Sequence, residues 1–392
     1  MSLPNLLMLT PSLPSPVGTG TMMRAAMSLE ALRKHFQVHV LNLNMWSWNL
    51  GRPSFVLNRA ASYAEVPGAN GDVDGATLLD RFFPSVSFAA IHSFRLVTAR
   101  VAVGMLAGIN APSGPKPRLV LDLDDDECSR SESVLKLLEE GGDQQAVSRA
   151  RADQTRLRML EKMLAPRFDA ICLAGLDDCR GFQKRYPRIA VHHLPNAIDL
   201  PENSAEAAAP RNESAPHSAA RLLFVGALYY PPNVDGICWF CERVLPVLQE
   251  IAGVPVSLQV VGADPLRIVE RLARNPAVTI QPNVRSVAPF YHETDLCIVP
   301  LRAGSGTRIK ILEAFSFRRP VVSTHLGAAG LAVTPGEQLL LADEPEAMAR
   351  ACLTMLKDHE RRDRMVGSAW QWVLENHSVA NVEAAMDLIH PR

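Results

Sequence analysis

No excess of charge of either sign marks this sequence: 40 Lys and Arg side chains offset 41 Asp and Glu side chains in 392 residues. A general nucleic-acid-binding protein usually carries a basic field, so this balance argues against that class. No run of about 18 consecutive apolar residues occurs, and the sequence therefore predicts no membrane-spanning helix. The apolar stretch Asn5–Leu9 is short, has no basic flank and runs into Pro11, so we expect no secretory signal peptide.

Cysteine is sparse, with seven residues scattered along the chain. Cys238 and Cys241 alone stand at a Cys-x-x-Cys spacing, and no second pair accompanies them to complete a tetrahedral metal site. We therefore expect reduced, mostly buried thiols, which are typical of a cytoplasmic protein. The sequence also lacks the Gly-x-Gly-x-x-Gly segment that opens a helix in nicotinamide-dependent dehydrogenases, and this absence argues against that class of enzyme.

The first half of the chain alternates short apolar strands with helices. We predict a buried strand at Leu6–Leu9, a loop of small residues at Pro11–Gly20, a helix at Met22–Lys34 and a second strand at Val38–Leu43. This order is a βαβ unit, which implies a parallel sheet. Further strands are predicted at Phe88–Ile91, Arg118–Leu123, Ala170–Leu173 and Val191–Leu194.

A low-complexity run at Glu202–Ala220 interrupts this alternation, as a linker or exposed loop would. Strands are predicted again at Leu222–Val225, Ser257–Val261, Val278–Ile280, Leu296–Val299, Val321–Ser323 and Leu339–Leu341. We predict an α/β fold of two tandem Rossmann-like parallel-sheet domains that face a central cleft. The expected parts are a first domain over residues 1–200, a linker over 201–220, a second domain over 221–375, and a C-terminal helix over 376–392 that could pack back on the first domain.

The strongest motif is the segment 300–330, PLRAGSGTRIKILEAFSFRRPVVSTHLGAAG. A small, flexible run precedes an apolar helix pattern, and free N–H groups at such a helix start form an anion site. Glu313, further along the helix, can accept hydrogen bonds from vicinal hydroxyls. The motif therefore predicts a site for the diphosphate and ribose of a nucleotide sugar. The plainer alternative is a solvent-facing Glu313 paired with Lys310.

The second half resembles the group 1 (GT4-type) glycosyltransferase family, which has the two-domain GT-B architecture. The matching segments are Phe224-Val225-Gly226, Pro232–Asp235, Trp239-Phe240, Val260-Val261-Gly262, Pro289-Phe290-Tyr291, GSGTRIKILEA and Pro320–Thr324. The first half resembles the family more weakly, through its glycine loop, His92 and Pro195–Asp199. The resemblance implies transfer of a sugar from a nucleotide diphosphate sugar to a saccharide or lipid-linked acceptor, with retention of anomeric configuration. It implies no resident cofactor and no required metal.

The resemblance also implies the residues of the site. Catalytic roles are expected for His92, Arg308 and Glu313. Donor and nucleotide contacts are expected from Gly18, Thr19, Gly226, Asn233, Val284, Arg285, Gly304, Ser305, Gly306, Thr307, Arg308, Lys310 and Glu313. In the family, Glu313 is the second member of a Glu-x7-Glu pair; Ser305 stands at the first position and supplies no negative charge.

Several of these residues have structural alternatives. Asn233 could be a helix N-cap, and Gly18 and Thr19 could form a turn. Only one of Arg308 and Lys310 is expected to face the ligand, because residues two apart on a helix point in different directions.

His92 is expected to end a strand and to face the cleft as a donor-sugar contact or proton-transfer group; a structural histidine is the alternative. The run Asp122–Glu127 contains the Asp-x-Asp pattern of metal-dependent glycosyltransferases. We favour an acceptor-facing or solvated acidic loop over a metal site, and therefore predict no metal ligands.

Two other functions stay open: a non-hydrolysing nucleotide-sugar epimerase of the same architecture, and a non-catalytic sugar-nucleotide-binding protein, which Ser305 would suit. The expected partners are a nucleotide-sugar donor and a saccharide or lipid-linked acceptor, without nucleic acid. We expect a cytoplasmic protein of polysaccharide biosynthesis. Its segment Met45–Leu50 could make a peripheral contact with the inner face of the membrane.

Overall fold

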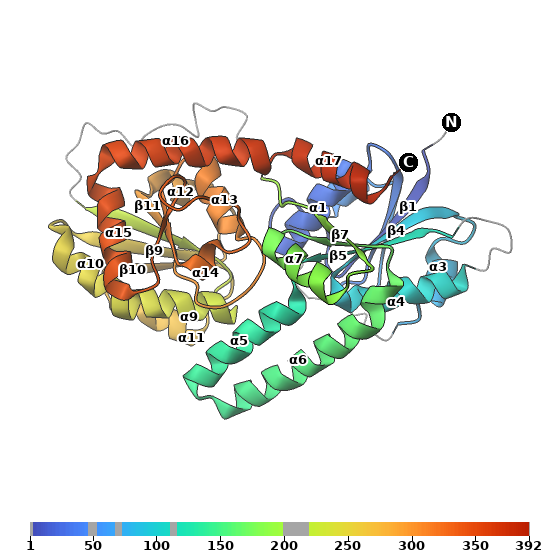
Figure 1. Cartoon of the computed structure of the whole chain (residues 1–392), viewed down its shortest axis with the longest axis horizontal. Helices are drawn as coiled ribbons and strands as arrows, with labels where there is room; N and C mark the ends of the chain where they lie inside the picture. Colours follow the sequence, from blue (N-terminus) through green and yellow to red (C-terminus); the bar gives the residue numbers. More distant parts are fainter. Residues whose placement is uncertain (1–2, 46–52, 67–72, 110–115, 199–218, 392) are drawn as a thin grey trace. The chain divides into compact units, whose positions relative to one another are not determined.

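The computed structural model describes residues 3–45, 53–66, 73–109, 116–198 and 219–391 (Figure 1). The chain divides into two compact units. Unit 1 comprises Met1–Glu132, Gln145–Ala197 and Val379–Arg392, and unit 2 comprises Ser133–Gln144 and Ile198–Ser378. The last helix therefore belongs to the first unit. Most of the predicted linker, and all of the segment Met45–Leu50 except its first residue, lie outside the described residues.

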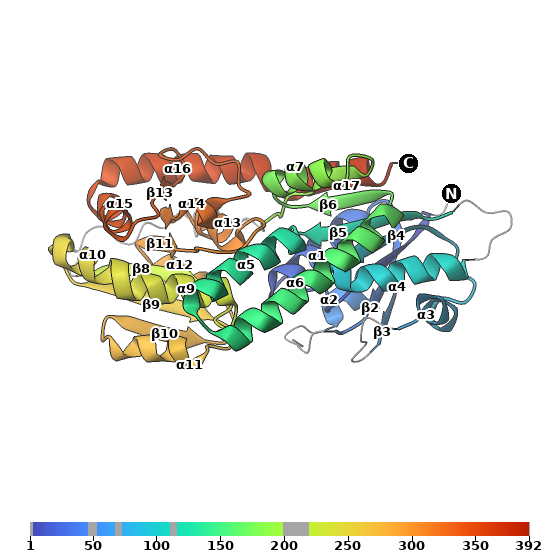
Figure 2. The ribbon, with the colours of Figure 1, turned by 60° about the horizontal axis from the view of Figure 1, so that its bottom comes forward.

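Unit 1 contains a seven-stranded parallel sheet in the order β3-β2-β1-β4-β5-β6-β7. Figure 2 labels the strands β2 to β6 of this sheet. The strands are β1 (Asn5–Thr10), β2 (Gln37–Asn42), β3 (Ser62–Glu65), β4 (Phe88–Phe94), β5 (Arg118–Asp124), β6 (Ala170–Leu173) and β7 (Ala190–His193). The helices are α1 (Gly20–Leu32), α2 (Ser54–Leu57), α3 (Gly75–Phe82), α4 (Arg95–Gly108), α5 (Glu127–Gly141, shared with unit 2), α6 (Gln144–Leu164), α7 (Leu176–Arg185) and α17 (Val379–Ile389).

Helices cover both faces of this sheet. Because side chains alternate along a strand, Leu7 and Leu9 of β1 pack into a cluster with α3, α4 and α7, whereas Leu6 and Met8 pack into a second cluster with α1 and α17. Strands that are buried on both faces show near-continuous apolar runs, which explains why most of them could be predicted.

Unit 2 contains a six-stranded parallel sheet in the order β10-β9-β8-β11-β12-β13. The strands are β8 (Ala220–Val225), β9 (Val256–Gly262), β10 (Val278–Pro282), β11 (Leu296–Val299), β12 (Val321–Ser323) and β13 (Leu340–Leu341). The helices are α9 (Pro231–Trp239), α10 (Leu245–Ala252), α11 (Arg267–Glu270), α12 (Ala288–Glu293), α13 (Ile309–Ser316), α14 (His325–Ala328), α15 (Pro345–Lys357) and α16 (His359–Asn376). The predicted α/β class with two parallel sheets is confirmed, and the central cleft stays a prediction.

A π-helical turn at Phe240–Val244 separates α9 from α10. Pro246 stands in the first turn of α10. Proline has no N–H to donate to the carbonyl four residues earlier, and its ring crowds that carbonyl, so the regular ladder is interrupted there.

All seven cysteines are unpaired, as the scattered spacing predicted. Within the described ranges, every helix is too short or too polar to cross a bilayer.

Candidate functional site

The glycine-rich loop of unit 2 leaves β11 at the carboxyl edge of the sheet, the edge where open parallel sheets bind ligands. Gly304 and Gly306 have φ angles of 113° and 78°, in the left-handed region that favours glycine. The N–H of Gly304 donates to Oγ of Ser133 at 3.0 Å. One of the amides expected to bind phosphate therefore already has a partner.

Arg308, the residue before α13, turns its side chain back on this loop. Arg308 is 8% exposed, and its Nη1 donates to the carbonyl oxygens of Ser305 and of Gly306, the latter at 2.9 Å. A β-carbon at Gly304 would lie only 3.1 Å from Nη2. The loop and Arg308 therefore form one packed unit in which the guanidinium fixes the direction of two carbonyl groups.

Lys310 lies in the first turn of α13 and points toward β8 and α9. Its Nζ donates to Oδ1 of Asn233 at 2.8 Å and lies 4.3 Å from the ring centroid of Phe224. A β-carbon at Gly226 would stand 2.8 Å from the same Nζ, so glycine makes room for the ammonium. Desolvation, and then the charge of Arg308, lower the pKa of Lys310 to about 7, against the opposite effect of Glu313. An anion placed here would favour the charged lysine.

Asn233 lies inside the first turn of α9, because Tyr230 occupies the N-cap position. The N-cap interpretation is therefore wrong. The side chain is 6% exposed, and its Nδ2 donates to the carbonyl of Ala227 at 2.9 Å while its Oδ1 accepts from Lys310. Asn233 thus ties the loop after β8 to α13.

Glu313 is half-buried, three residues after Lys310 and hence on the same side of α13. Its Oε2 accepts a hydrogen bond from the hydroxyl of Tyr291 at 2.9 Å, and none of the described residues donates to Oε1. Burial raises the pKa of Glu313, while the bond from Tyr291 and the charge of Lys310 act in the opposite direction. A solvent-facing glutamate paired only with Lys310 is therefore not what the structure contains.

Two further loops end at the same edge of the unit 2 sheet. Gly262 closes β9, where a β-carbon would meet the carbonyl oxygen of Gly226 at 1.7 Å, so only glycine fits. Asn283, with a φ of 53°, begins the loop that carries Val284 and Arg285, and its Oδ1 accepts from the N–H of Asp264 at 3.1 Å. The roles expected for the backbones of Val284 and Arg285 in base recognition stay predictions.

The glycine loop of unit 1 precedes α1. Gly18 has a φ of 122°, which requires glycine, and Thr19 is the N-cap residue of α1, although its side chain makes no capping bond. Both belong to unit 1 and the α13 residues belong to unit 2. Their predicted donor contacts stay predictions.

His92 lies two residues before the end of β4 and is completely buried. The predicted position at the strand end is therefore wrong. Its Nδ1 is 3.0 Å from Nε2 of His390 beyond α17, and its Nε2 is 3.6 Å from Oδ2 of Asp122. Burial, followed by His92 and Arg118, holds the pKa of His390 well below its usual value. The structural alternative accounts for this packing, and the catalytic role of His92 stays a prediction.

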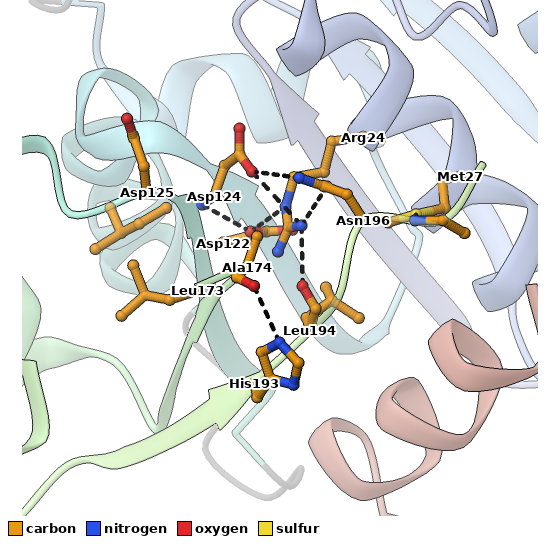
Figure 3. A network of polar contacts seen from close by, with 12 residues as sticks. Arg24, Met27, Asp122, Asp124, Asp125, Leu173, Ala174, His193, Leu194 and Asn196 are labelled. Atoms are coloured by element: carbon orange, nitrogen blue, oxygen red, sulfur yellow. Dashed lines mark hydrogen bonds and ion pairs between the residues drawn. The ribbon is translucent and has the colours of Figure 1, made fainter. Parts of the chain in front are cut away.

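A buried network around Arg24 was not predicted from the sequence (Figure 3). Arg24 is 2% exposed on α1, and its Nε donates to both oxygens of Asp122 at 2.8 and 3.0 Å. Its Nη1 donates to Oδ1 of Asn196 at 2.7 Å and to the carbonyl of Leu194 at 3.0 Å. Asn196 in turn donates to Asp124 at 3.2 Å. The one signal for this network was an arginine among the apolar residues of Met22–Leu32.

The rest of the acidic run is also enclosed by arginines. Asp125 pairs with Arg95 and Arg130 at 2.6 Å each, and Asp126 pairs with Arg185 at 2.7 Å. The expected solvated loop is therefore wrong, because these carboxylates are buried and depend on cationic partners, and the acceptor-facing role stays a prediction. In the part of the chain that the structure describes, no group of three His, Cys, Asp or Glu side chains has the geometry of a metal site.

Comparison with known proteins agrees with these features. Residues 219–358 match the family described as "Glycosyl transferases group 1". A curated relative, an "uncharacterized 44.6 kDa protein in cps region" of Klebsiella pneumoniae, is 27% identical over 172 residues. This match covers 41% of the chain and 43% of the relative, less than half the length of either.

Solved structures share the whole fold. Sucrose-phosphate synthase from Thermosynechococcus elongatus has a TM-score of 0.71 at 14% identity, with 98% of both chains covered. A glycosyltransferase from Rickettsia africae has 0.67 at 11% identity, over 100% of this chain and 98% of that one. Anabaena Alr3699/HepE, in complex with UDP and glucose, has 0.65 at 14% identity, over 98% and 99% of the two chains.

Two parallel sheets of this kind, with these structural neighbours, define the GT-B class. The structural neighbours therefore give the chain the GT-B fold, and the family match assigns residues 219–358, which lie in unit 2, to the group 1 glycosyltransferases.

Proposed function

We propose that this chain transfers a sugar from a nucleotide diphosphate sugar, bound by unit 2, to a saccharide or lipid-linked acceptor, with retention of anomeric configuration. The observation that carries the proposal is the placement of Lys310 and Glu313 on one side of α13, at the carboxyl edge of the sheet, where Lys310 contacts Asn233 and Glu313 contacts Tyr291. A cation and a carboxylate acceptor three residues apart suit a diphosphate and the ribose beside it.

The chemical problem is charge. The diphosphate gains negative charge as its bond to the anomeric carbon breaks, while that carbon becomes oxocarbenium-like. We infer that Lys310, Arg308 and the start of α13 stabilise this charge, without a resident cofactor or a required metal. Oε1 of Glu313 would accept from a ribose hydroxyl. Unit 1 would hold the acceptor, and a lipid-linked acceptor would bring the protein to the inner face of a membrane.

A panel of nucleotide diphosphate sugars in a thermal-shift assay tests the donor site. One donor should stabilise the wild-type chain, by about 2.7 kcal/mol at a hundredfold excess over its Kd, and this gain should vanish in Glu313→Ala. The matched control is Glu337→Ala, which removes an exposed glutamate of the same unit. No stabilisation by any donor would contradict the proposal, and donor binding without transfer to any acceptor would favour a non-catalytic binding protein.

Donor affinity should depend on pH through Lys310. The pKa of about 7 in the empty site means that the side chain is mostly neutral above pH 7 and must take up a proton to pair with a diphosphate. Affinity should therefore fall as pH rises from 7.5 to 9, by up to about tenfold per pH unit. Titration calorimetry should show this fall in the wild type and lose it in Lys310→Arg, whose guanidinium stays charged. An equal slope in both proteins would contradict the role of Lys310.

A further inference from the structure

We propose that Tyr291 is a positioning residue of the donor site, which fixes the carboxylate of Glu313 so that one oxygen is presented to the ligand. This inference rests on the proposed function. Tyr291 belongs to α12, and although its segment Pro289-Phe290-Tyr291 is part of the family resemblance, no role at the donor site was expected for its side chain.

The phenol of Tyr291 is held against α13 from two sides. The residue is 1% exposed, and its ring stacks on Phe317 with a centroid separation of 4.9 Å and an interplanar angle of 6°. Phe317 is the C-cap residue of α13. The hydroxyl lies 2.9 Å from Oε2 of Glu313 and 3.4 Å from the carbonyl oxygen of Lys310. The ring therefore contacts the end of α13 and the hydroxyl contacts its middle, which leaves the hydroxyl a single direction.

In this geometry the two carboxylate oxygens of Glu313 have different roles: one binds Tyr291, and the other can bind the ligand. The terminal torsion of a glutamate is broad and roughly two-fold, so helix position alone does not orient the carboxylate. The bond from Tyr291 removes that freedom by using Oε2, and Oε1 is left to accept a ligand hydroxyl. A carboxylate oriented before binding loses less entropy when the ligand arrives.

The same bond also favours the charged form of Glu313, because a hydrogen bond donated to a carboxylate stabilises the anion in a desolvated position. The charged and titratable groups beside this pair are Lys310 on α13 and Cys297 on β11. Lys310 also favours the anion. Loss of the Tyr291 hydroxyl should therefore shift the protonation of Glu313 to higher pH.

The experiment compares Tyr291→Phe with Tyr186→Phe. Tyr186 of unit 1 donates a bond of the same kind, from its hydroxyl to Oε1 of Glu161 at 3.1 Å. Each variant removes one oxygen from a tyrosine–glutamate pair, so both should lower the thermal midpoint to a similar extent. Binding of UDP, ADP, GDP, CDP and dTDP is then measured by calorimetry. We expect Tyr291→Phe to weaken binding of the preferred nucleotide about tenfold and Tyr186→Phe to leave it unchanged.

The dependence of nucleotide affinity on pH is a second measurement, and a loss of stability alone would not change it. The acid limb of nucleotide affinity should lie at higher pH in Tyr291→Phe than in the wild type and in Tyr186→Phe, because the hydrogen bond from Tyr291 lowers the pKa of Glu313. The ionisation of the nucleotide is common to all three proteins and cancels.

The outcomes separate this inference from the function on which it rests. Failure of every nucleotide to bind the wild type would overturn the proposed function and the positioning role with it. Binding that Glu313→Ala abolishes, but that Tyr291→Phe leaves with wild-type affinity and an unshifted acid limb, would overturn the positioning role alone.

Discussion

Replacement of Arg308 by alanine is expected to lower sugar transfer by about 10²–10³-fold, with a smaller effect on thermal stability. Two changes combine in this variant. A cation is removed from the start of α13, where negative charge would develop on the leaving diphosphate. The carbonyls of Ser305 and Gly306 also lose the guanidinium that directs them, so the amides of the loop are no longer held in place for phosphate.

Two further variants separate these effects. Arg308→Lys keeps the charge but cannot span both carbonyls, and its activity should lie between those of the wild type and the alanine variant. Arg302 lies in the same loop and is half-exposed, and its Nε donates to Asp235 of α9 at 2.9 Å. Turnover in Arg302→Ala should change less than threefold. The assay follows release of nucleoside diphosphate from the donor that stabilises the wild type. Equal turnover in Arg302→Ala and Arg308→Ala would contradict the role of Arg308.

Most of the fold could be predicted because most strands of the two sheets are local apolar runs. Strand β6 has the predicted bounds, Ala170–Leu173, and all four of its residues are buried. Strand β3 was missed because it is an edge strand of the sequence Ser-Tyr-Ala-Glu, with every residue only partly buried. The π-helical turn before α10 was missed because helical periodicity continues through it. Sequence patterns therefore identified buried elements and failed at edges and irregular turns.

The site divides in the same way between local and long-range features. Gly304, Lys310 and Glu313 lie within ten residues of one another, so a motif can reveal them. Their partners come from far along the chain: Tyr291 is 22 residues from Glu313, and Asn233 is 77 residues from Lys310. A single sequence carries no signal for such contacts.

His92 is an example of a residue whose surroundings depend on such a long-range contact. Its enclosure depends on His390, 298 residues further along the chain. The apolar pattern of the strand predicted a position at its end, whereas the C-terminal segment that packs in unit 1 determines its surroundings. The arginines that pair with Asp122, Asp125 and Asp126 could not be matched to these carboxylates for the same reason.

The Arg24 network gives the largest expected effect on stability. Asp122→Ala should lower the free energy of unfolding of unit 1 by about 3–5 kcal/mol, because it leaves a buried guanidinium without its closest carboxylate. Asp124 is the next carboxylate, at 3.6 Å from Nη1, and it can compensate only in part. Asp177→Ala is the matched control in the same unit. It breaks an exposed pair with Arg180 and should leave stability almost unchanged.

Hydrogen exchange of the amides in β5 and β6 measures this loss within unit 1, whatever the stability of unit 2. The double variant Arg24→Met with Asp122→Leu should recover much of the stability, since it removes both charges and keeps the volume. Equal protection in Asp122→Ala and Asp177→Ala would show that the network contributes little to stability.

The network also bears on function, because Arg24 ties the first turns of α1, just after Gly18 and Thr19, to the ends of β5 and β7. The recovered double variant then separates two roles: stability without donor binding would mean that the charges themselves hold the glycine loop in its binding position.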